Sequence, residues 1–177
     1  MRLSEEEKLQ ELGNLEEFLN SVEIAAQLVP KGGMLDDVSL LVCLPSVEDM
    51  PEGLEDATEE NMHLMSACLM ELDDSQEKIS KYLGCYTQIR TDMTGLPELE
   101  VLKLVNRMNR TVRVGHYFYD EPEGAGGKLV QYRASVMGAA GQPLDEGVVA
   151  EAILEMGIGY DMMKDALEDL AKEYRKS

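Results

Sequence analysis

Four side chains of the kinds that bind zinc are spread along this sequence: His63, Cys68, Cys85 and His116. A structural zinc site brings four such ligands within tetrahedral reach, and pairs of them usually stand a few residues apart in the chain. No such spacing is present, so we interpret the four as packed strand residues and expect no metal and no other cofactor. Nucleophilic catalysis needs a Ser or Cys beside an oriented base. Both histidines lie in strand-like segments and no Gly-x-Ser-x-Gly turn occurs, so we predict no catalytic residue and no enzyme activity.

A basic patch runs off the end of a predicted helix into the next strand: Lys103, Arg107, Arg110 and Arg113. Cations near a helix C-terminus complement its dipole, and we favour this role, with pairing to surplus carboxylates, over a site for an anionic partner. The amides of Asn106 and Asn109, one turn apart, are predicted to satisfy terminal carbonyls or turn groups. Gly124, Gly126 and Gly127 lie between two strands and predict a hairpin turn, since they open no helix that could hold a phosphate.

Acidic side chains are too numerous to mark a site, and those of the two long helical segments fit solvated helix faces: Glu16, Glu17, Glu23, Glu151, Glu155 and Glu168. The chain of 177 residues holds 35 Asp and Glu against 16 Lys and Arg, a net charge of −19. This balance opposes binding to nucleic acid, whose phosphates attract Lys and Arg, and to anionic membranes. The sequence therefore predicts neither nucleic acid nor membrane as a partner.

Length and composition fit one domain over 1–177, because 44% hydrophobic residues are enough to form a core. The longest apolar run, 38–44, is too short to cross a bilayer. The acidic residues 5–7 stand where a signal peptide would be basic and then apolar. Three cysteines cannot all pair, and they fit reduced, buried thiols. Together these features predict a cytoplasmic protein.

Hydrophobic periodicity predicts the elements in chain order: helix 4–29, strands 38–44, 62–72 and 82–91, helix 97–109, strands 111–119 and 129–137, and helix 145–175. Segment 62–72 also fits a short helix, and we assign it as a strand because two clearer strands flank it. Ser4 and Glu7 resemble a capping box, and Gly13 could interrupt the first helix. Residues 46–61 form an acidic loop. The fold class is α+β, with an antiparallel sheet of about five strands and the order α-β-β-β-α-β-β-α.

Several short motifs follow one another in the second half of the chain: LKLVNRMNR at 102–110, HYFYD at 116–120, a glycine turn, LVQYRA at 129–134 and the pair Leu144-Asp145. With these motifs the second half of the chain resembles the YbjN family, which is similar in structure to the type III secretion chaperones. The resemblance implies a compact, secretion-chaperone-like α+β domain, usually a homodimer, that binds other proteins or has no assigned function. It implies no catalytic residue.

The last helix is apolar on more than one side. One stripe fits a contact with the sheet, and in helix 97–109 a similar stripe is expected at Leu99, Leu102, Val105 and Met108. The candidates for a dimer or partner contact on the last helix are Leu154, Ile158, Tyr160, Met162, Met163, Ala166 and Tyr174. Of these, Tyr160 and Met163 also belong to the sheet-facing stripe, and the other five extend the apolar surface beyond it. Gly157 and Gly159 would let another backbone approach closely or let the helix bend. The alternative is that the first helix covers this surface within one chain.

We therefore expect a non-catalytic protein-binding or chaperone-like module that acts as a homodimer. Its sheet and terminal helix would present a Met- and Tyr-rich apolar surface to a partner segment, and the negative charge would select basic or neutral partners. The alternative function is a small-ligand-binding regulator or small enzyme with a pocket beneath the sheet.

Overall fold

The computed structural model describes residues 3–32, 36–44, 63–70, 79–122 and 126–175. Its elements are α1 (Glu5–Ser21), β1 (Ala26–Val29), β2 (Ser39–Leu44), β3 (His63–Leu69), β4 (Ser80–Gln88), α2 (Glu98–Met108), β5 (His116–Asp120), β6 (Leu129–Ala139) and α3 (Glu146–Arg175). The strands form one antiparallel six-stranded sheet in the order β1-β2-β3-β4-β6-β5. The α+β class and the antiparallel sheet are confirmed, with one strand more than expected.

The additional strand arises because α1 ends earlier than predicted. The capping box at its start is present, with the Glu7 N–H donating to Ser4 Oγ at 3.2 Å, and Gly13 lies inside the helix without breaking it. The helix stops at Ser21, and Glu23 adopts a left-handed conformation with φ of 65°. This reverses the chain, so that Ala26–Val29 pairs with β2. The prediction of one helix over 4–29 was wrong.

The strands predicted over 38–44, 62–72, 82–91 and 129–137 are confirmed where the structure describes them, with differences of a few residues at their ends. The strand predicted over 111–119 begins later than expected, at His116, because residues 111–115 form the turn that follows α2, with Gly115 at a positive φ. Segment 62–72 is a strand over His63–Leu69, and β1 to β4 follow one another in the sheet as a meander. Strands β5 and β6 form the predicted antiparallel pair, with Asp120 opposite Leu129. The acidic segment 46–61 and part of the glycine turn, 123–125, lie outside the described residues.

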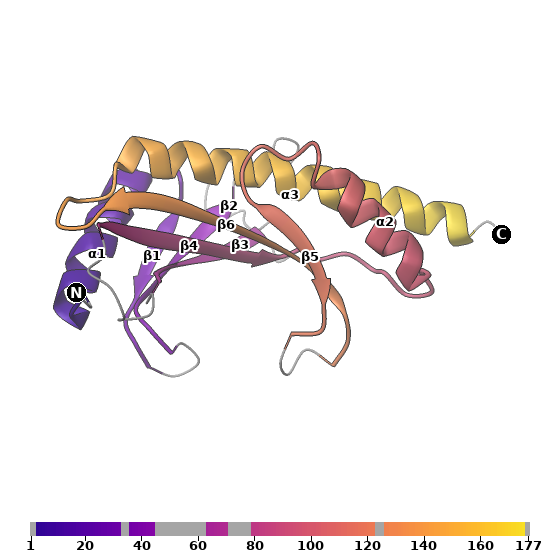
Figure 1. Cartoon of the computed structure of the whole chain (residues 1–177), viewed down its shortest axis with the longest axis horizontal. Helices are drawn as coiled ribbons and strands as arrows, with labels where there is room; N and C mark the ends of the chain where they lie inside the picture. The colour runs from indigo at the N-terminus through magenta and orange to yellow at the C-terminus, as the bar shows by residue number, and fades with distance from the viewer. Residues whose placement is uncertain (1–2, 33–35, 45–62, 71–78, 123–125, 176–177) are drawn as a thin grey trace.

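Helix α3 runs along the length of the sheet and covers one of its faces (Figure 1). Its residues Met156, Tyr160 and Met163 are buried against alternate strand residues such as Leu40 and Val130. Helix α1 packs against β1, β2 and α3, and α2 packs against β5 and α3. The core therefore lies between α3 and the sheet face that α3 covers.

Helix α2 buries a different stripe from the one that its sequence suggested. Val105 and Met108 are buried as predicted, but Val101 and Leu104 complete the stripe, while Leu99 and Leu102 are exposed. The apolar residues of α2 extend around more than half of a turn, so spacing alone did not identify the side that meets β5.

On each edge strand of the sheet, one residue has its outward N–H and carbonyl bonded to an asparagine amide from the end of the preceding helix. On β1, Asn20 accepts from the Ala26 N–H and donates to the Ala26 carbonyl, both at 3.0 Å. On β5, Asn109 makes the same two hydrogen bonds to Tyr117, at 2.7 and 3.0 Å. The Glu16 carboxylate also accepts from the Leu28 N–H at 2.8 Å. These side chains occupy edge groups that would otherwise be open to another strand.

Replacing Asn109 by alanine is expected to lower the free energy of unfolding by about 1–2 kcal/mol, because two backbone groups of Tyr117 lose their partner. Urea unfolding followed by circular dichroism measures this loss. Asn106→Ala is the matched control: Asn106 is exposed, and its replacement should change stability by less than about 0.5 kcal/mol. Equal effects of the two substitutions would contradict the role of Asn109 at the edge.

Candidate protein-binding surfaces

The seven candidate residues of the last helix divide between its two sides. Leu154, Ile158 and Met162 are exposed on the side of α3 away from the sheet, and we call these three residues the outer stripe. Ala166 is half-buried, and Tyr174 is exposed near the end of the helix: neither belongs to the outer stripe.

The other two candidates, Tyr160 and Met163, lie in the core and are not accessible to a partner. The Tyr160 ring stacks on His63 with centroids 4.0 Å apart, and its hydroxyl accepts from the Arg90 N–H at 2.9 Å. Met163 is fully buried. Their inclusion among the surface residues is corrected, because both pack into the core on the side of α3 that meets the sheet, as their place in the predicted sheet-facing stripe indicated.

Gly159 does allow a close approach, but by side chains of the same chain. The Tyr117 hydroxyl donates to the Gly159 carbonyl at 2.6 Å, and the Tyr132 hydroxyl donates to the Val114 carbonyl beside it. A Cβ at Gly159 would stand 2.6 Å from Tyr132 Oη. The glycine therefore serves the packing of α3 on two tyrosines of the sheet.

Acidic side chains border the outer stripe. Glu151 and Asp165 are exposed one turn from its members, and Asp161 lies beside Met162 in the chain. Glu155 pairs with Arg113 at 3.1 Å. The outer stripe is therefore an apolar ridge with exposed carboxylates beside it.

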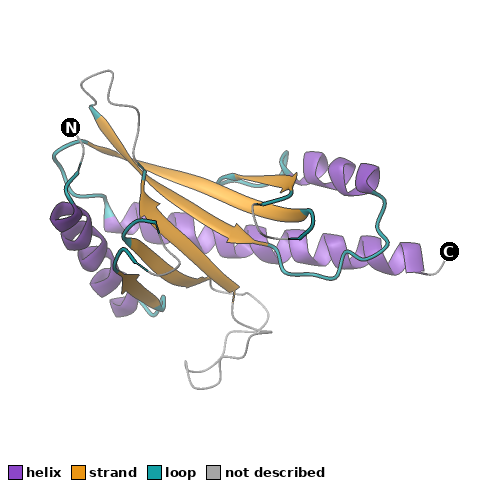
Figure 2. Cartoon of the chain, turned by 90° about the horizontal axis from the view of Figure 1, so that it is seen from below, coloured by secondary structure: helices purple, strands orange, loops and turns teal. Residues whose placement is uncertain are grey.

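The face of the sheet turned away from α3 is a second accessible surface, seen with α3 behind it in Figure 2. We call it the open face. It consists of the strand residues that alternate with the buried ones. Its apolar members include Val29, Leu41, Cys43, Leu64, Cys68, Met70, Tyr82, Tyr86, Phe118, Leu129 and Met137. Its polar members are Ser66, Gln88, His116, Asp120, Gln131, Arg133 and Ser135. Leu64, Met70 and Met137 are the exposed large hydrophobic residues among them.

Sequence reasoning predicted that the sheet contributes to an apolar surface, but it named none of the residues of the open face. The available signal was that β2 and β3 read SLLVCL and HLMSACL, with apolar residues at both alternating sets of positions. A strand covered on one face only would show polar residues at every second position. The missing alternation therefore leaves apolar side chains on both faces of these strands.

Arg133 is held in a fixed arrangement on the open face. Its guanidinium lies 5.4 Å from the Tyr86 ring centroid and 5.1 Å from that of Phe118, and it donates to Gln131 Oε1 at 3.0 Å. Gln131 itself is 2% exposed. Two aromatic rings and a buried amide thus orient the cation.

The structure does not bring the four zinc-type ligands together. His63 and Cys85 lie on the face that α3 covers, whereas Cys68 and His116 lie on the open face. Among the described residues, no group of three or more His, Cys, Asp or Glu side chains could hold a metal ion.

Burial raises the pKa of all three thiols. The pKa of Cys85 rises to about 12 because the side chain is buried. Burial also raises the pKa of Cys43 and Cys68, which are only partly covered. Since the thiolate is the reactive form, each cysteine reacts more slowly at pH 8 than a free thiol.

We expect Cys85 to resist Ellman's reagent at pH 8 until the chain is unfolded, whereas Cys43 and Cys68 react slowly in the folded protein. Absorbance of the released thiolate measures both rates. The double variant C43S/C68S isolates Cys85, and its rapid reaction without denaturant would contradict the burial of this thiol.

The basic residues fall partly into ion pairs, as predicted. Lys103 pairs with Glu100 at 2.8 Å, and Arg113 pairs with Glu155. Arg107 and Arg110 are exposed on the last turn of α2 and just beyond it. Two of the glutamates that were predicted to be solvated also have contacts within the chain: Glu155 pairs with Arg113, and Glu16 accepts from the Leu28 N–H.

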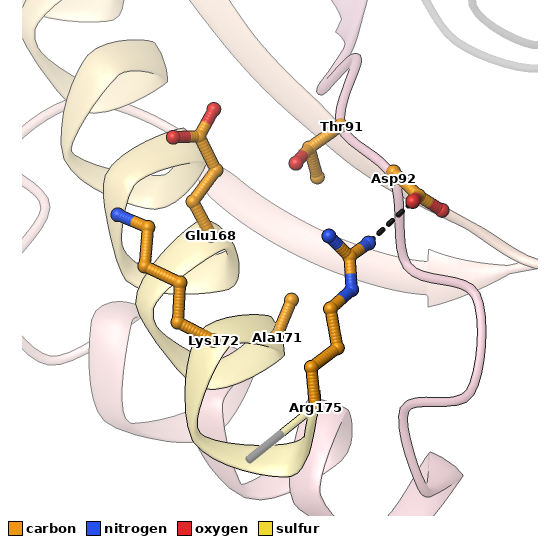
Figure 3. A pocket seen from close by; sticks show the side chains of 6 residues that line it. All are labelled: Thr91, Asp92, Glu168, Ala171, Lys172 and Arg175. Carbon is orange, nitrogen blue, oxygen red and sulfur yellow. Dashed lines mark hydrogen bonds and ion pairs between the residues drawn. The ribbon is translucent and has the colours of Figure 1, made fainter.

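A polar pocket of about 280 Å³ lies between the segment after β4 and the end of α3, as Figure 3 shows. It is lined by Thr91, Asp92, Glu168, Ala171, Lys172 and Arg175. The ion pair of Arg175 with Asp92 crosses it. Hydrogen bonds from Thr94, and then Arg175, hold the pKa of the Asp92 carboxyl below its usual value. The two acids and two bases balance one another, so the lining favours no charged ligand.

In comparisons with known proteins, no family model, no curated protein and no solved structure matches this chain. None of the helices in the described ranges combines the length and apolar character that crossing a bilayer requires.

Proposed function

We propose that this protein is a non-catalytic, chaperone-like binding module that acts as a homodimer and takes up basic, amphipathic segments of other proteins. The observation that carries the proposal is the outer stripe of α3, whose apolar residues Leu154, Ile158 and Met162 are exposed within an acidic border.

Helix geometry supports this reading. The three residues follow one another at intervals of four, so they form a continuous ridge over more than two turns. A helix of a partner could lay its own apolar face along such a ridge. Met162 adds an adaptable thioether, which suits a surface that accepts more than one sequence.

Charge supports a basic partner. The chain carries −19 overall, and Glu151 and Asp165 flank the stripe. Basic groups beside the apolar face of a partner would speed its approach and select it over acidic segments. The resemblance of the second half to the YbjN family agrees with a protein-binding role and a homodimer.

A labelled amphipathic Lys/Leu helix tests the proposal by fluorescence anisotropy, with a Glu/Leu helix of equal apolar content as the control probe. We expect the basic peptide alone to bind, and its affinity to fall as salt is added. The double variant I158E/M162E should weaken binding at least about tenfold, which corresponds to about 1.4 kcal/mol.

Two outcomes would contradict the proposal. Equal binding of the basic peptide by I158E/M162E would exclude the outer stripe as its site. A monomeric mass by light scattering, with the protein at tens of micromolar, would exclude the homodimer. Met137→Glu, on the opposite side of the molecule, is the matched control and should leave peptide affinity unchanged.

A further inference from the structure

The open face is nearly free of charge in a strongly acidic chain. Of its strand residues, only Arg133 and Asp120 carry a formal charge when His116 is neutral, whereas 29% of the whole chain is charged. We propose that a second copy of this chain packs on the open face, sheet against sheet. This inference rests on the proposed homodimer and specifies its interface.

The distribution of charge favours a second copy of the chain, rather than a basic partner, as the occupant of the open face. Two chains that each carry −19 repel one another, so they approach best through a surface without net charge. The open face is such a surface, because its one cation and one anion cancel. A basic segment gains nothing there and gains attraction at the acidic border of the outer stripe.

The two charges of the open face also suit a symmetric contact. Arg133 lies on β6 and Asp120 on the neighbouring β5, and Asp120 stands opposite Leu129, four residues before Arg133. In a twofold contact the same patch meets itself, so a cation on one copy can face an anion on the other. A patch with both signs is therefore self-complementary.

The size of the face fits a dimer of moderate strength. Six strands about 4.8 Å apart, each of roughly seven residues, span roughly 600 Å² per copy. Two copies would then cover roughly 1,200 Å², the lower end of the range for stable, specific interfaces. Sheets commonly pack face to face at such a distance that side chains from both fill the space between them.

Contact edge to edge is the competing way for two sheets to join, and the structure opposes it. Asn20 occupies the N–H and carbonyl of Ala26 on β1, and Asn109 those of Tyr117 on β5. With these edge groups occupied, two copies can still join through the apolar side chains of their open faces.

Met70 lies over Gly84 and beside Ser135. A flexible side chain that can adapt to a partner surface therefore lies near the middle of the open face.

Matched charge substitutions on the two surfaces test the interface. Met137→Glu and Leu64→Glu alter the open face at residues that are 64% and 41% exposed. Met162→Glu and Leu154→Glu alter the outer stripe at residues that are 41% and 46% exposed. Sedimentation velocity over a range of concentrations gives the dissociation constant of the dimer, and circular dichroism verifies folding.

We expect a dimeric wild type, at least about tenfold weaker dimers for M137E and L64E, and unchanged dimers for M162E and L154E, because only the first pair brings like charges together across the interface. Unchanged dimers for M137E and L64E, or dissociation by M162E and L154E, would overturn the open-face interface and leave the homodimer standing. A monomeric wild type would overturn both. The affinity of M137E for the basic peptide is measured separately, so that the peptide site on the outer stripe is tested independently of the dimer interface.

Discussion

Replacing Gly115 by alanine is expected to destabilise the fold by about 3 kcal/mol or more, through left-handed strain and overpacking together. Gly115 has a φ of 75°. A Cβ there would stand 2.2 Å from the Arg133 carbonyl oxygen and 2.9 Å from the Ala134 Cβ. These atoms belong to β6, which is paired with β4 on one side and β5 on the other, so they cannot move aside without disturbing the sheet.

Gly141→Ala is the matched control for this substitution. Gly141 has a φ of 77° and nothing within 4 Å of an added Cβ, so alanine should cost only the left-handed strain of about 1 kcal/mol. Urea unfolding curves of both variants give the difference. Losses of equal size would contradict the steric part of the argument, since the two glycines share their backbone conformation.

Gly115 also connects stability with the proposed interface. It directly precedes β5, which carries His116 and Phe118 on the open face. A chain that makes room for a methyl group at position 115 would displace the Phe118 ring, 5.1 Å from the Arg133 guanidinium. We therefore expect any folded fraction of G115A to dimerise less well than the wild type.

Elements with strong local signals were predictable from sequence. The capping box of Ser4 and Glu7 fixed the start of α1, and the long periodic pattern identified α3 to within one residue of Glu146. The alternation around a glycine turn identified the β5–β6 pair. In each case residues near one another in the chain determine the structure, so spacing was sufficient.

The end of α1 was not predictable in the same way. Helices commonly stop where a glycine adopts the left-handed conformation, and here a glutamate, Glu23, does so. Ala26 continues the helical spacing from Val22, and the stronger stop signal of Pro30 and the following glycines stands further on. Pairing with β2, a tertiary contact, decided that Ala26–Val29 is a strand.

The candidate surfaces were predictable only in part for a similar reason. Sequence spacing showed that α3 is apolar around much of its circumference, but the sheet determines which residues are inside. Tyr160 reaches the Arg90 N–H and His63, partners that no spacing on α3 reveals. The amide of Asn109 was predicted to satisfy terminal carbonyls of α2 or turn groups. It does satisfy backbone groups, but these belong to Tyr117 of β5.

Both proposed surfaces depend on α3 as a rigid support. Its inner side is fixed by hydroxyl groups of the sheet: Tyr117 donates to the Gly159 carbonyl at 2.6 Å, and Tyr132 lies against the same glycine. Burial raises the pKa of both tyrosines, because the phenolate would be poorly solvated there. The hydroxyls thus stay protonated and able to donate at physiological pH.

Gly159→Ala is therefore expected to destabilise the protein, although alanine is the better helix former by about 1 kcal/mol. The added Cβ would stand 2.6 Å from Tyr132 Oη and 3.0 Å from Tyr117 Oη, and both hydroxyls are held by hydrogen bonds to backbone carbonyls. Overpacking of this kind costs about 1–3 kcal/mol. After the gain of about 1 kcal/mol in helix propensity is subtracted, we expect a net loss of up to about 2 kcal/mol.

The opposite sign is expected for Gly13→Ala in α1, where an added Cβ would meet Leu28 at an ordinary 3.9 Å. There the helix propensity dominates, and stability should rise by about 0.5–1 kcal/mol.

Tyr132→Phe removes the hydroxyl that the Cβ of G159A would overlap. The double variant G159A/Y132F should therefore lose less stability than the sum of the losses of its single variants. Thermal and urea unfolding of all four proteins measure these differences. A stabilising G159A, or strict additivity with Y132F, would mean that α3 can shift away from the tyrosines and is not the rigid support that both surfaces require.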